Sequence, residues 1–157
     1  MKIDKNILKK VKMYCAKTEC STLDVKLYLQ KLEVNSEDII EKIINNLKSE
    51  NFINEERYIR AFINDKFKLN KWGKYKIKQS LLSKGFDEND IDKLINETIN
   101  EEEYKNTLTE IIEKKKKLLK KDDTNVIKQK ISKFALSKGY EPDLIKTIVE
   151  SIMSKEV

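Results

Sequence analysis

One five-residue sequence occurs twice in this chain, each time followed by the same spacing of apolar residues. Leu82–Phe86 (LSKGF) is matched 54 residues later by Leu136–Tyr140 (LSKGY). The apolar residues that follow are Ile91, Leu94, Ile95 and Ile99 in the first copy, and Ile145, Ile148, Val149 and Met153 in the second. Because both copies keep a glycine that can end a helix and an apolar stripe after it, the chain is predicted to contain a repeated helical unit.

The composition favours helices joined by tight turns. The 157 residues include only three glycines and one proline to interrupt helices. Charged residues make up 38% and apolar residues 39%, which is typical of helices with one buried stripe and solvated faces. No run approaches the roughly 20 apolar residues of a membrane span, and Met1–Lys5 lacks the apolar core of a signal peptide. We expect a cytoplasmic protein.

Residues that commonly catalyse reactions or bind metals are scarce. There is no histidine, and the two cysteines, Cys15 and Cys20, would lie about 140° apart on a helix. They lack the partners of a zinc site and are expected to be packing residues with free thiols. No glycine-rich phosphate loop or nucleophile elbow is present in the sequence. We therefore expect no enzymatic activity, no metal and no cofactor.

The middle unit, residues 53–99, has the clearest helical pattern. A helix with a wide apolar face is predicted from Glu55 to Leu69. A shorter helix should run from about Gly73 to Lys84, where Gly85 supplies the left-handed residue that ends it. Asp87 is the predicted N-cap of the third helix.

The third unit, residues 100–157, repeats this pattern with insertions. Tyr104 matches Tyr58 at an offset of 46. Ile127–Gln129 then matches Ile77–Gln79 at an offset of 50, and Leu136–Tyr140 matches Leu82–Phe86 at an offset of 54. The offset therefore grows by four residues at each step. Since four residues make about one helical turn, each insertion should lengthen a helix and keep its inward face.

The first unit, residues 1–52, is the most divergent. Its helices are predicted from Lys5 to Lys17, after a Ser21 N-cap, and after an Asn35 N-cap. At the position of the turn glycine it has Glu33. A left-handed cap there would cost about 1 kcal/mol, or the turn must differ.

These units predict an all-α fold of three tandem three-helix repeats, residues 1–52, 53–99 and 100–157. A unit with one apolar face cannot bury it alone, so stacking of the repeats should produce an elongated, curved array. The concave side of such an array suits long partners.

The position of the charges says more about partners than the net charge of +6. Residues 66–86 hold seven lysines and no acid, whereas residues 87–92 hold four acids. With Trp72 and Tyr75 interleaved, these lysines would form a positive patch for phosphates or an acidic protein groove. The alternative is a solvated helix face on which Trp72 is a packing residue.

Two other groups of basic residues have different interpretations. The lysine run between Lys114 and Lys121 wraps more than one helical turn and is expected to be a solvated face. Arg57 and Arg60 are the only arginines among 33 basic residues. Arginine's planar fork pairs with carboxylates in a way that lysine cannot replace, so Arg57 is expected to pair either inside the repeat or on a partner.

Four features of the middle unit together carry a family resemblance. They are Phe52–Phe62 (FINEERYIRAF), Gly73 with its basic neighbours, Ile77–Gln79, and the Lys84–Phe86 turn. This combination resembles the RecX family of recombinase regulators. The resemblance extends over the third unit and is weakest in the first, where the family's usual turn glycine is Glu33 and its usual arginine is at best Lys17.

The resemblance implies a regulator without catalytic activity that binds along the groove of a RecA filament on DNA, across neighbouring subunits. Such binding restrains strand exchange, ATPase and coprotease function. The residues expected to contact the partner are Arg57, Arg60, Lys66, Lys68, Lys71, Trp72, Lys74, Lys76 and Lys78. Direct contact with single-stranded DNA stays open, and neither a membrane nor a small-molecule substrate is expected.

Two alternative functions remain. One is a stand-alone nucleic-acid-binding module, in which the lysines meet phosphates directly. The other is a helical-repeat adaptor whose concave face takes a helical peptide.

Overall fold

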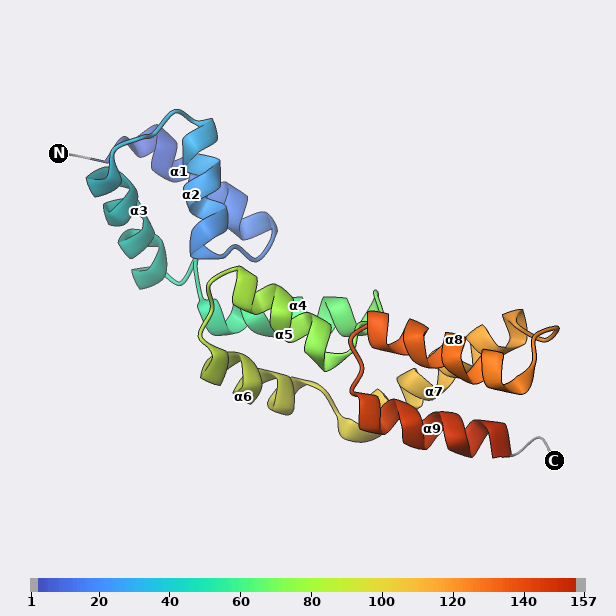
Figure 1. Cartoon of the computed structure of the whole chain (residues 1–157). Coiled ribbons are helices and arrows are strands. Elements are labelled where there is room, and N and C mark those ends of the chain that lie inside the picture. The colour runs from blue at the N-terminus through green and yellow to red at the C-terminus, as the bar shows by residue number, and fades with distance from the viewer. Residues whose placement is uncertain (1–2, 155–157) are drawn as a thin grey trace. The chain divides into compact units, whose positions relative to one another are not determined.

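The computed structural model describes residues 3–154 (Figure 1). Within this range the chain forms α-helices and no β-strand, as the sequence predicted. The helices are α1 (Lys5–Lys17), α2 (Thr22–Lys31), α3 (Glu37–Ser49), α4 (Glu55–Lys68), α5 (Lys74–Ser83), α6 (Glu88–Thr98), α7 (Glu101–Leu118), α8 (Thr124–Ser137) and α9 (Pro142–Ser154). None of the helices described is long and apolar enough to cross a bilayer.

The chain divides inside α4 into two compact units, one ending at Ala61 and the other beginning at Phe62. The boundaries expected between three-helix repeats, at residues 52/53 and 99/100, stay predictions, as does the curved stacking of those repeats.

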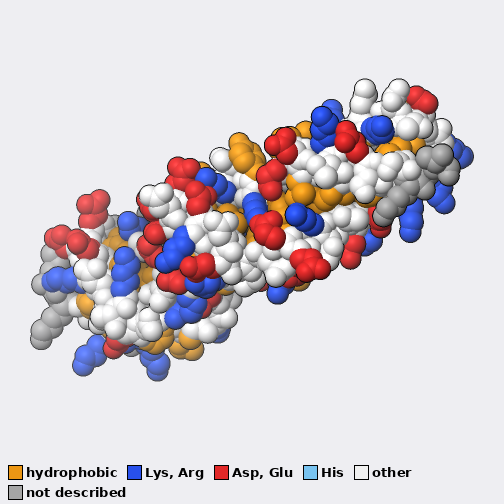
Figure 2. Space-filling view, turned by 90° about the horizontal axis from the view of Figure 1, so that it is seen from below, with side chains coloured by type: hydrophobic (Ala, Val, Ile, Leu, Met, Phe, Trp, Pro, Cys, Tyr) orange, Lys and Arg blue, Asp and Glu red, His pale blue; other side chains and the backbone are white. Residues whose placement is uncertain are grey.

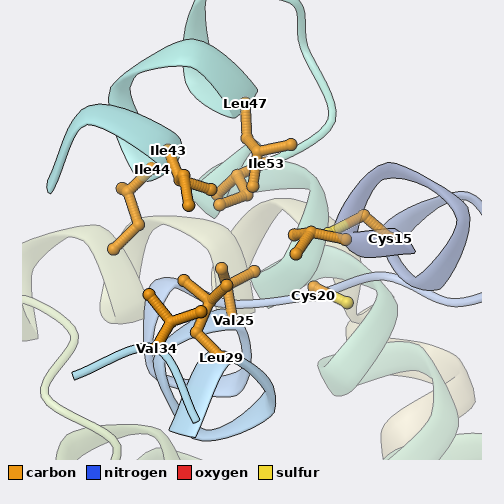
Figure 3. Close-up of a cluster of buried hydrophobic side chains, with 10 residues drawn as sticks. Cys15, Cys20, Val25, Leu29, Val34, Ile43, Ile44, Leu47 and Ile53 are labelled. Atoms are coloured by element: carbon orange, nitrogen blue, oxygen red, sulfur yellow. The ribbon is translucent and has the colours of Figure 1, made fainter. Parts of the chain in front are cut away.

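The first unit is built around side chains from α1, α2 and α3. Val11, Leu29 and Leu47 are fully buried at its centre, and Figure 3 shows the cluster to which they belong. Cys15 and Cys20 lie in the same cluster as free thiols, as predicted. Because α1 ends at Lys17, Cys20 lies in the turn beyond it, so the angle expected between two helical positions does not apply.

Caps at the predicted N-termini are confirmed with one exception. Ser21 and Asp24 form a reciprocal capping box at the start of α2, with distances of 3.1 and 3.0 Å. Asp87 caps α6. The prediction for α3 was wrong by one residue: Ser36, not Asn35, accepts the hydrogen bond from the Ile39 N–H.

Glu33 adopts the left-handed conformation that glycine has in the other two repeats. Its φ is 63°, compared with 92° for Gly85 and 98° for Gly139. In each case the next residue donates its N–H to a carbonyl five residues back; after Glu33 this bond joins Val34 to Leu29 at 2.9 Å. The three turns therefore have the same backbone geometry. At Glu33 the left-handed conformation costs about 1 kcal/mol, because the residue has a Cβ.

In the second unit α5 packs on α6, and α7, α8 and α9 pack on one another (Figure 1). The predicted insertions do lengthen helices: α7 has 18 residues where α4 has 14, and α8 has 14 where α5 has 10. Each added turn leaves the inward stripe in register, so Leu108, Ile112 and Ile131 remain buried.

Candidate partner-binding surface on α4 and α5

A tight turn brings Trp72 back against the last turn of α4. Lys71 takes a left-handed conformation (φ 59°), and the Trp72 N–H donates to the Lys66 carbonyl at 3.0 Å. This reversal caps the end of α4 and sets Trp72 beside the side chain of Lys66. The turn therefore brings together residues from the end of one helix and the start of the next.

The backbone between α4 and α5 crosses close to the backbone between α8 and α9, and hydrogen bonds join the two turns. The Gly73 N–H donates to the Lys138 carbonyl at 2.7 Å, and the Tyr75 N–H donates to the Gly139 carbonyl at 3.0 Å. There is no room for a side chain at the crossing, because a Cβ on Gly73 would lie 2.3 Å from the Gly139 carbonyl carbon. Glycine is required at residue 73 for this close approach rather than for an unusual φ.

Two buried tyrosines complete the attachment. The Tyr140 hydroxyl donates to the Lys71 carbonyl at 2.9 Å. The Tyr104 hydroxyl accepts the Lys74 N–H at 2.9 Å and donates to the Glu141 carboxylate. Burial, followed by the hydrogen bond to Glu141, raises the pKa of Tyr104, so this hydroxyl keeps its proton and can donate. Tyr140 and Tyr104 thus hold the backbone of residues 71–74 in place.

Three lysines and two aromatic rings alternate on the surface above this turn, and we call them the aromatic–lysine ladder: Lys84, Phe62, Lys66, Trp72 and Lys76. The Lys66 Nζ lies 4.9 Å from the centre of the Trp72 ring and 5.5 Å from that of Phe62. The Lys76 Nζ lies 4.5 Å from the centre of the Trp72 ring, and the Lys84 Nζ lies 5.6 Å from that of the Phe62 ring. These distances are those of cation–π contacts.

The ladder lysines keep their positive charge available. In the part of the chain that the structure describes, Lys66, Lys76 and Lys84 form no salt bridge with a carboxylate. A ring attracts an ammonium group through its quadrupole and leaves the net charge unchanged. The rings therefore order the lysine side chains without neutralising them.

Two of the predicted lysines are neutralised within the chain. Lys74 pairs with Glu101 and lies over the Tyr104 ring. Lys78 pairs with both Glu88 and Asp92 at 2.9 Å. Hydrogen bonds to these two carboxylates raise the pKa of Lys78 and hold it in its charged form. Lys74 and Lys78 are therefore occupied by internal partners.

The remaining predicted residues have different surroundings. Lys68 and Lys71 are exposed. Arg57 pairs inside the chain: its Nε lies 2.5 Å from Glu19, and a terminal nitrogen donates to the Asn51 and Phe52 carbonyls. Arg60 pairs with Glu56 one turn earlier on α4. Arg57 therefore pairs within the chain, with a residue outside the predicted repeat of residues 53–99. Its contact with a partner stays a prediction.

Sequence reasoning missed Phe62 as a member of this surface. Lys84 is one of the seven lysines of the predicted positive patch but was not among the residues expected to contact the partner. Phe62 lies on the helix predicted from Glu55 to Leu69 and is only partly buried. The spacing of Phe62 and Lys66, one helical turn apart, was the available signal.

Other parts of the surface carry both signs of charge, and Figure 2 shows basic and acidic side chains interspersed over the face in view. No group of three potential metal ligands lies among the residues described.

Comparison with known proteins decides the family. Residues 54–95 match the family model for the second three-helix domain of RecX, and residues 101–149 match that for the third. A Regulatory protein RecX from Clostridium botulinum (strain Eklund 17B / Type B) is 33% identical over 152 residues, which cover 91% of this chain and 70% of that protein. The chain belongs to the RecX family. RecX proteins are named as regulatory proteins, not as enzymes.

Further RecX proteins are longer than this chain. The Regulatory protein RecX of Clostridioides difficile (strain 630) is 34% identical over 118 residues, covering 75% of this chain and 55% of the relative. That of Clostridium perfringens (strain 13 / Type A) is 38% identical over 123 residues, with 76% and 56% covered. The chain thus spans a little over half the length of these relatives.

Solved RecX structures share the fold. RecX from Lactobacillus salivarius superposes with a TM-score of 0.82 at 23% identity, over 93% of this chain and 94% of that one. A second regulatory protein RecX gives a TM-score of 0.82 at 18% identity, over 92% and 72%. At these identities the likeness concerns the fold alone.

Proposed function

We propose that this chain binds the RecA–DNA filament across neighbouring recombinase subunits and restrains its ATPase, strand-exchange and coprotease activities. Membership of the RecX family supports a regulatory role. The chain would act in the cytoplasm by occupying the filament, with no reaction of its own, no cofactor and no small-molecule substrate. Bound across two subunits, it would hinder the rearrangement that accompanies each ATP cycle.

The aromatic–lysine ladder is the observation that carries this proposal. Among residues 3–154 its three ammonium groups form no salt bridge with a carboxylate, while nearby Lys74 and Lys78 are neutralised. Ordering a long side chain on binding costs roughly 0.5–1.5 kcal/mol. Contacts with the rings already restrict the lysine side chains in the unbound protein, so less of this cost remains to be met on binding. An ordered, positively charged strip complements an acidic groove of a nucleoprotein filament.

Charge reversal on the ladder tests the proposal. Lys66→Glu combined with Lys76→Glu should weaken binding to a RecA filament on single-stranded DNA by roughly 10- to 100-fold, which corresponds to about 1.4–2.8 kcal/mol. Binding would be measured by fluorescence anisotropy of labelled protein against preassembled filaments. Circular dichroism should show that the helices are retained.

A matched control carries the same change of charge elsewhere. Lys114→Glu with Lys117→Glu reverses two exposed lysines on α7, outside the ladder. This variant should bind within roughly twofold of the unaltered protein, a difference of about 0.4 kcal/mol. Equal weakening by both pairs would contradict the assignment of the ladder, because it would mean that only total charge matters.

A second candidate function is direct binding of single-stranded nucleic acid. It is favoured by Trp72, whose partly exposed ring lies within 5 Å of the Lys66 and Lys76 ammonium groups and could stack with an unpaired base. Quenching of Trp72 fluorescence by an oligonucleotide without recombinase, weakening steeply with salt, would support this function. Absence of quenching at concentrations that saturate the filament would leave the filament as the partner.

A further inference from the structure

We propose that a lysine-rimmed apolar groove on α1 binds an acidic amphipathic helix of a protein partner. The groove belongs to the unit that ends at Ala61 and shares no residue with the aromatic–lysine ladder. It would therefore be a second interaction surface, independent of the one proposed for the filament.

The floor of the groove is apolar and open to solvent. It has a volume of about 450 Å³ and is lined by Leu8, Met13, Ala16 and Phe52. Met13 is 55% exposed and is absent from the apolar cluster that fills this unit. Met13 therefore adds an exposed apolar side chain to the lining of the hollow and is not needed to fill the core.

The rim of the groove is positively charged. Lys5, Lys9 and Lys12 lie on one face of α1, because they are separated by four and then three residues. Lys12 is partly neutralised by Glu50 at 2.5 Å and lies over the Phe52 ring. Lys5 and Lys9 are exposed, and no salt bridge to either occurs among the described residues. The groove therefore carries two lysines that have no carboxylate partner within residues 3–154, next to its apolar lining.

This combination fits one kind of partner. From Lys5 to Ala16 the floor and rim follow α1 for about 17 Å, or three helical turns. A partner helix of similar length would place apolar residues one turn apart on Leu8, Met13 and Phe52. Acidic residues on its flanks would then meet Lys5 and Lys9.

A membrane surface fits this groove less well than a partner helix does, because α1 has no broad apolar face left free. The main apolar stripe of α1 is already used inside the unit, where Val11 is fully buried, Cys15 is 7% exposed and Ile7 packs on the cluster. A helix that lies in a bilayer interface needs a broad free apolar face. What α1 leaves free is the hollow lined by Leu8, Met13, Ala16 and its lysine side chains, which a ridge of side chains can fill.

The experiment uses a fluorescein-labelled helical peptide of roughly four turns, with leucines about one turn apart and glutamates on both flanks. Titration of the full chain should give saturable anisotropy that Lys9→Glu weakens by roughly tenfold, or about 1.4 kcal/mol. Met13→Ser should weaken it similarly, because it removes an exposed side chain and leaves the core intact. In NMR spectra of the labelled protein, shifts should concentrate on α1 and Phe52.

Lys10→Glu is the matched control, since Lys10 is exposed on the same helix but does not line the groove. It should leave binding unchanged. The proposal is overturned by any of three results: no saturable binding of the acidic peptide, equal binding of a peptide with lysines in place of the glutamates, or equal weakening by Lys9→Glu and Lys10→Glu. Binding to anionic vesicles with the same dependence on Lys9, in place of peptide binding, would also overturn it.

Discussion

Adding one methyl group at Gly73 is expected to destabilise the unit that begins at Phe62 far more than the same change at Gly85. The φ of Gly73 is −77°, so alanine fits the backbone conformation, and the cost is purely steric. The new Cβ would lie 2.3 Å from the Gly139 carbonyl carbon and 2.5 Å from the Tyr140 nitrogen. Ordinary carbon contacts are about 3.5–4.0 Å, so the two turns would have to separate by more than about 1 Å.

The size of the loss follows from the contacts at the crossing. Separation would break the Gly73–Lys138 and Tyr75–Gly139 hydrogen bonds, worth about 1 kcal/mol each, and steric strain adds about 1–3 kcal/mol. Gly73→Ala should therefore cost about 3–5 kcal/mol. Gly85 has a φ of 92° and no atom within 4 Å of an added Cβ, so Gly85→Ala should cost only about 1 kcal/mol.

Urea unfolding measures this difference directly. Trp72 is the only tryptophan and adjoins Gly73, so its fluorescence reports on the unit concerned. The midpoint for Gly73→Ala should fall well below that of Gly85→Ala, which should lie slightly below the unaltered protein. Equal midpoints for the two variants would refute the reasoning, because they would show that the backbone crossing contributes nothing to stability.

Three further changes test the first unit. Glu33→Gly should raise its stability by about 1 kcal/mol in urea unfolding followed by circular dichroism, since the φ of 63° favours glycine; no gain would contradict this. Arg57→Lys should cost about 1 kcal/mol, because lysine cannot bind Glu19 and two carbonyls together, whereas Arg60→Lys should cost less; the reverse order would be inconsistent. Burial raises the pKa of Cys15 to about 12, so its neutral thiol stabilises the fold below pH ~8.5, and this contribution is lost as the pH rises toward 12. Between about pH 8.5 and 12 the urea midpoint of Cys15→Ala should therefore fall less steeply than that of the unaltered protein. Identical pH profiles of the two proteins would show that the Cys15 thiol does not contribute to this pH dependence.

The local features of the fold could be predicted from the sequence because short-range chemistry determines them. The bounds of α1 and the cap at Ser21 follow from apolar spacing and side chains that accept backbone N–H groups. The cap of α3 was misplaced because Asn35 and Ser36 are both capable N-caps, and the sequence does not show which hydroxyl or amide reaches the Ile39 N–H.

Features that join distant segments could not be predicted. Gly73 and Gly139 are far apart in the sequence, and their close approach depends on how α8 and α9 pack. For the same reason the pairing of Lys74 with Glu101 was not foreseen. The sequence showed an excess of lysine over residues 66–86, but only the structure separates lysines with internal carboxylate partners from those that lie against aromatic rings.

The ATPase rate of RecA on single-stranded DNA, measured while this protein is titrated, tests the proposed function most directly. The unaltered protein should lower the rate at ratios well below one per recombinase monomer, since one bound molecule would hinder neighbouring subunits. The Lys66→Glu, Lys76→Glu variant should need roughly tenfold more protein for the same effect, in line with its weaker binding. An unchanged rate in the presence of saturating protein, with tight and salt-sensitive binding to DNA alone, would contradict the account and favour a nucleic-acid-binding module.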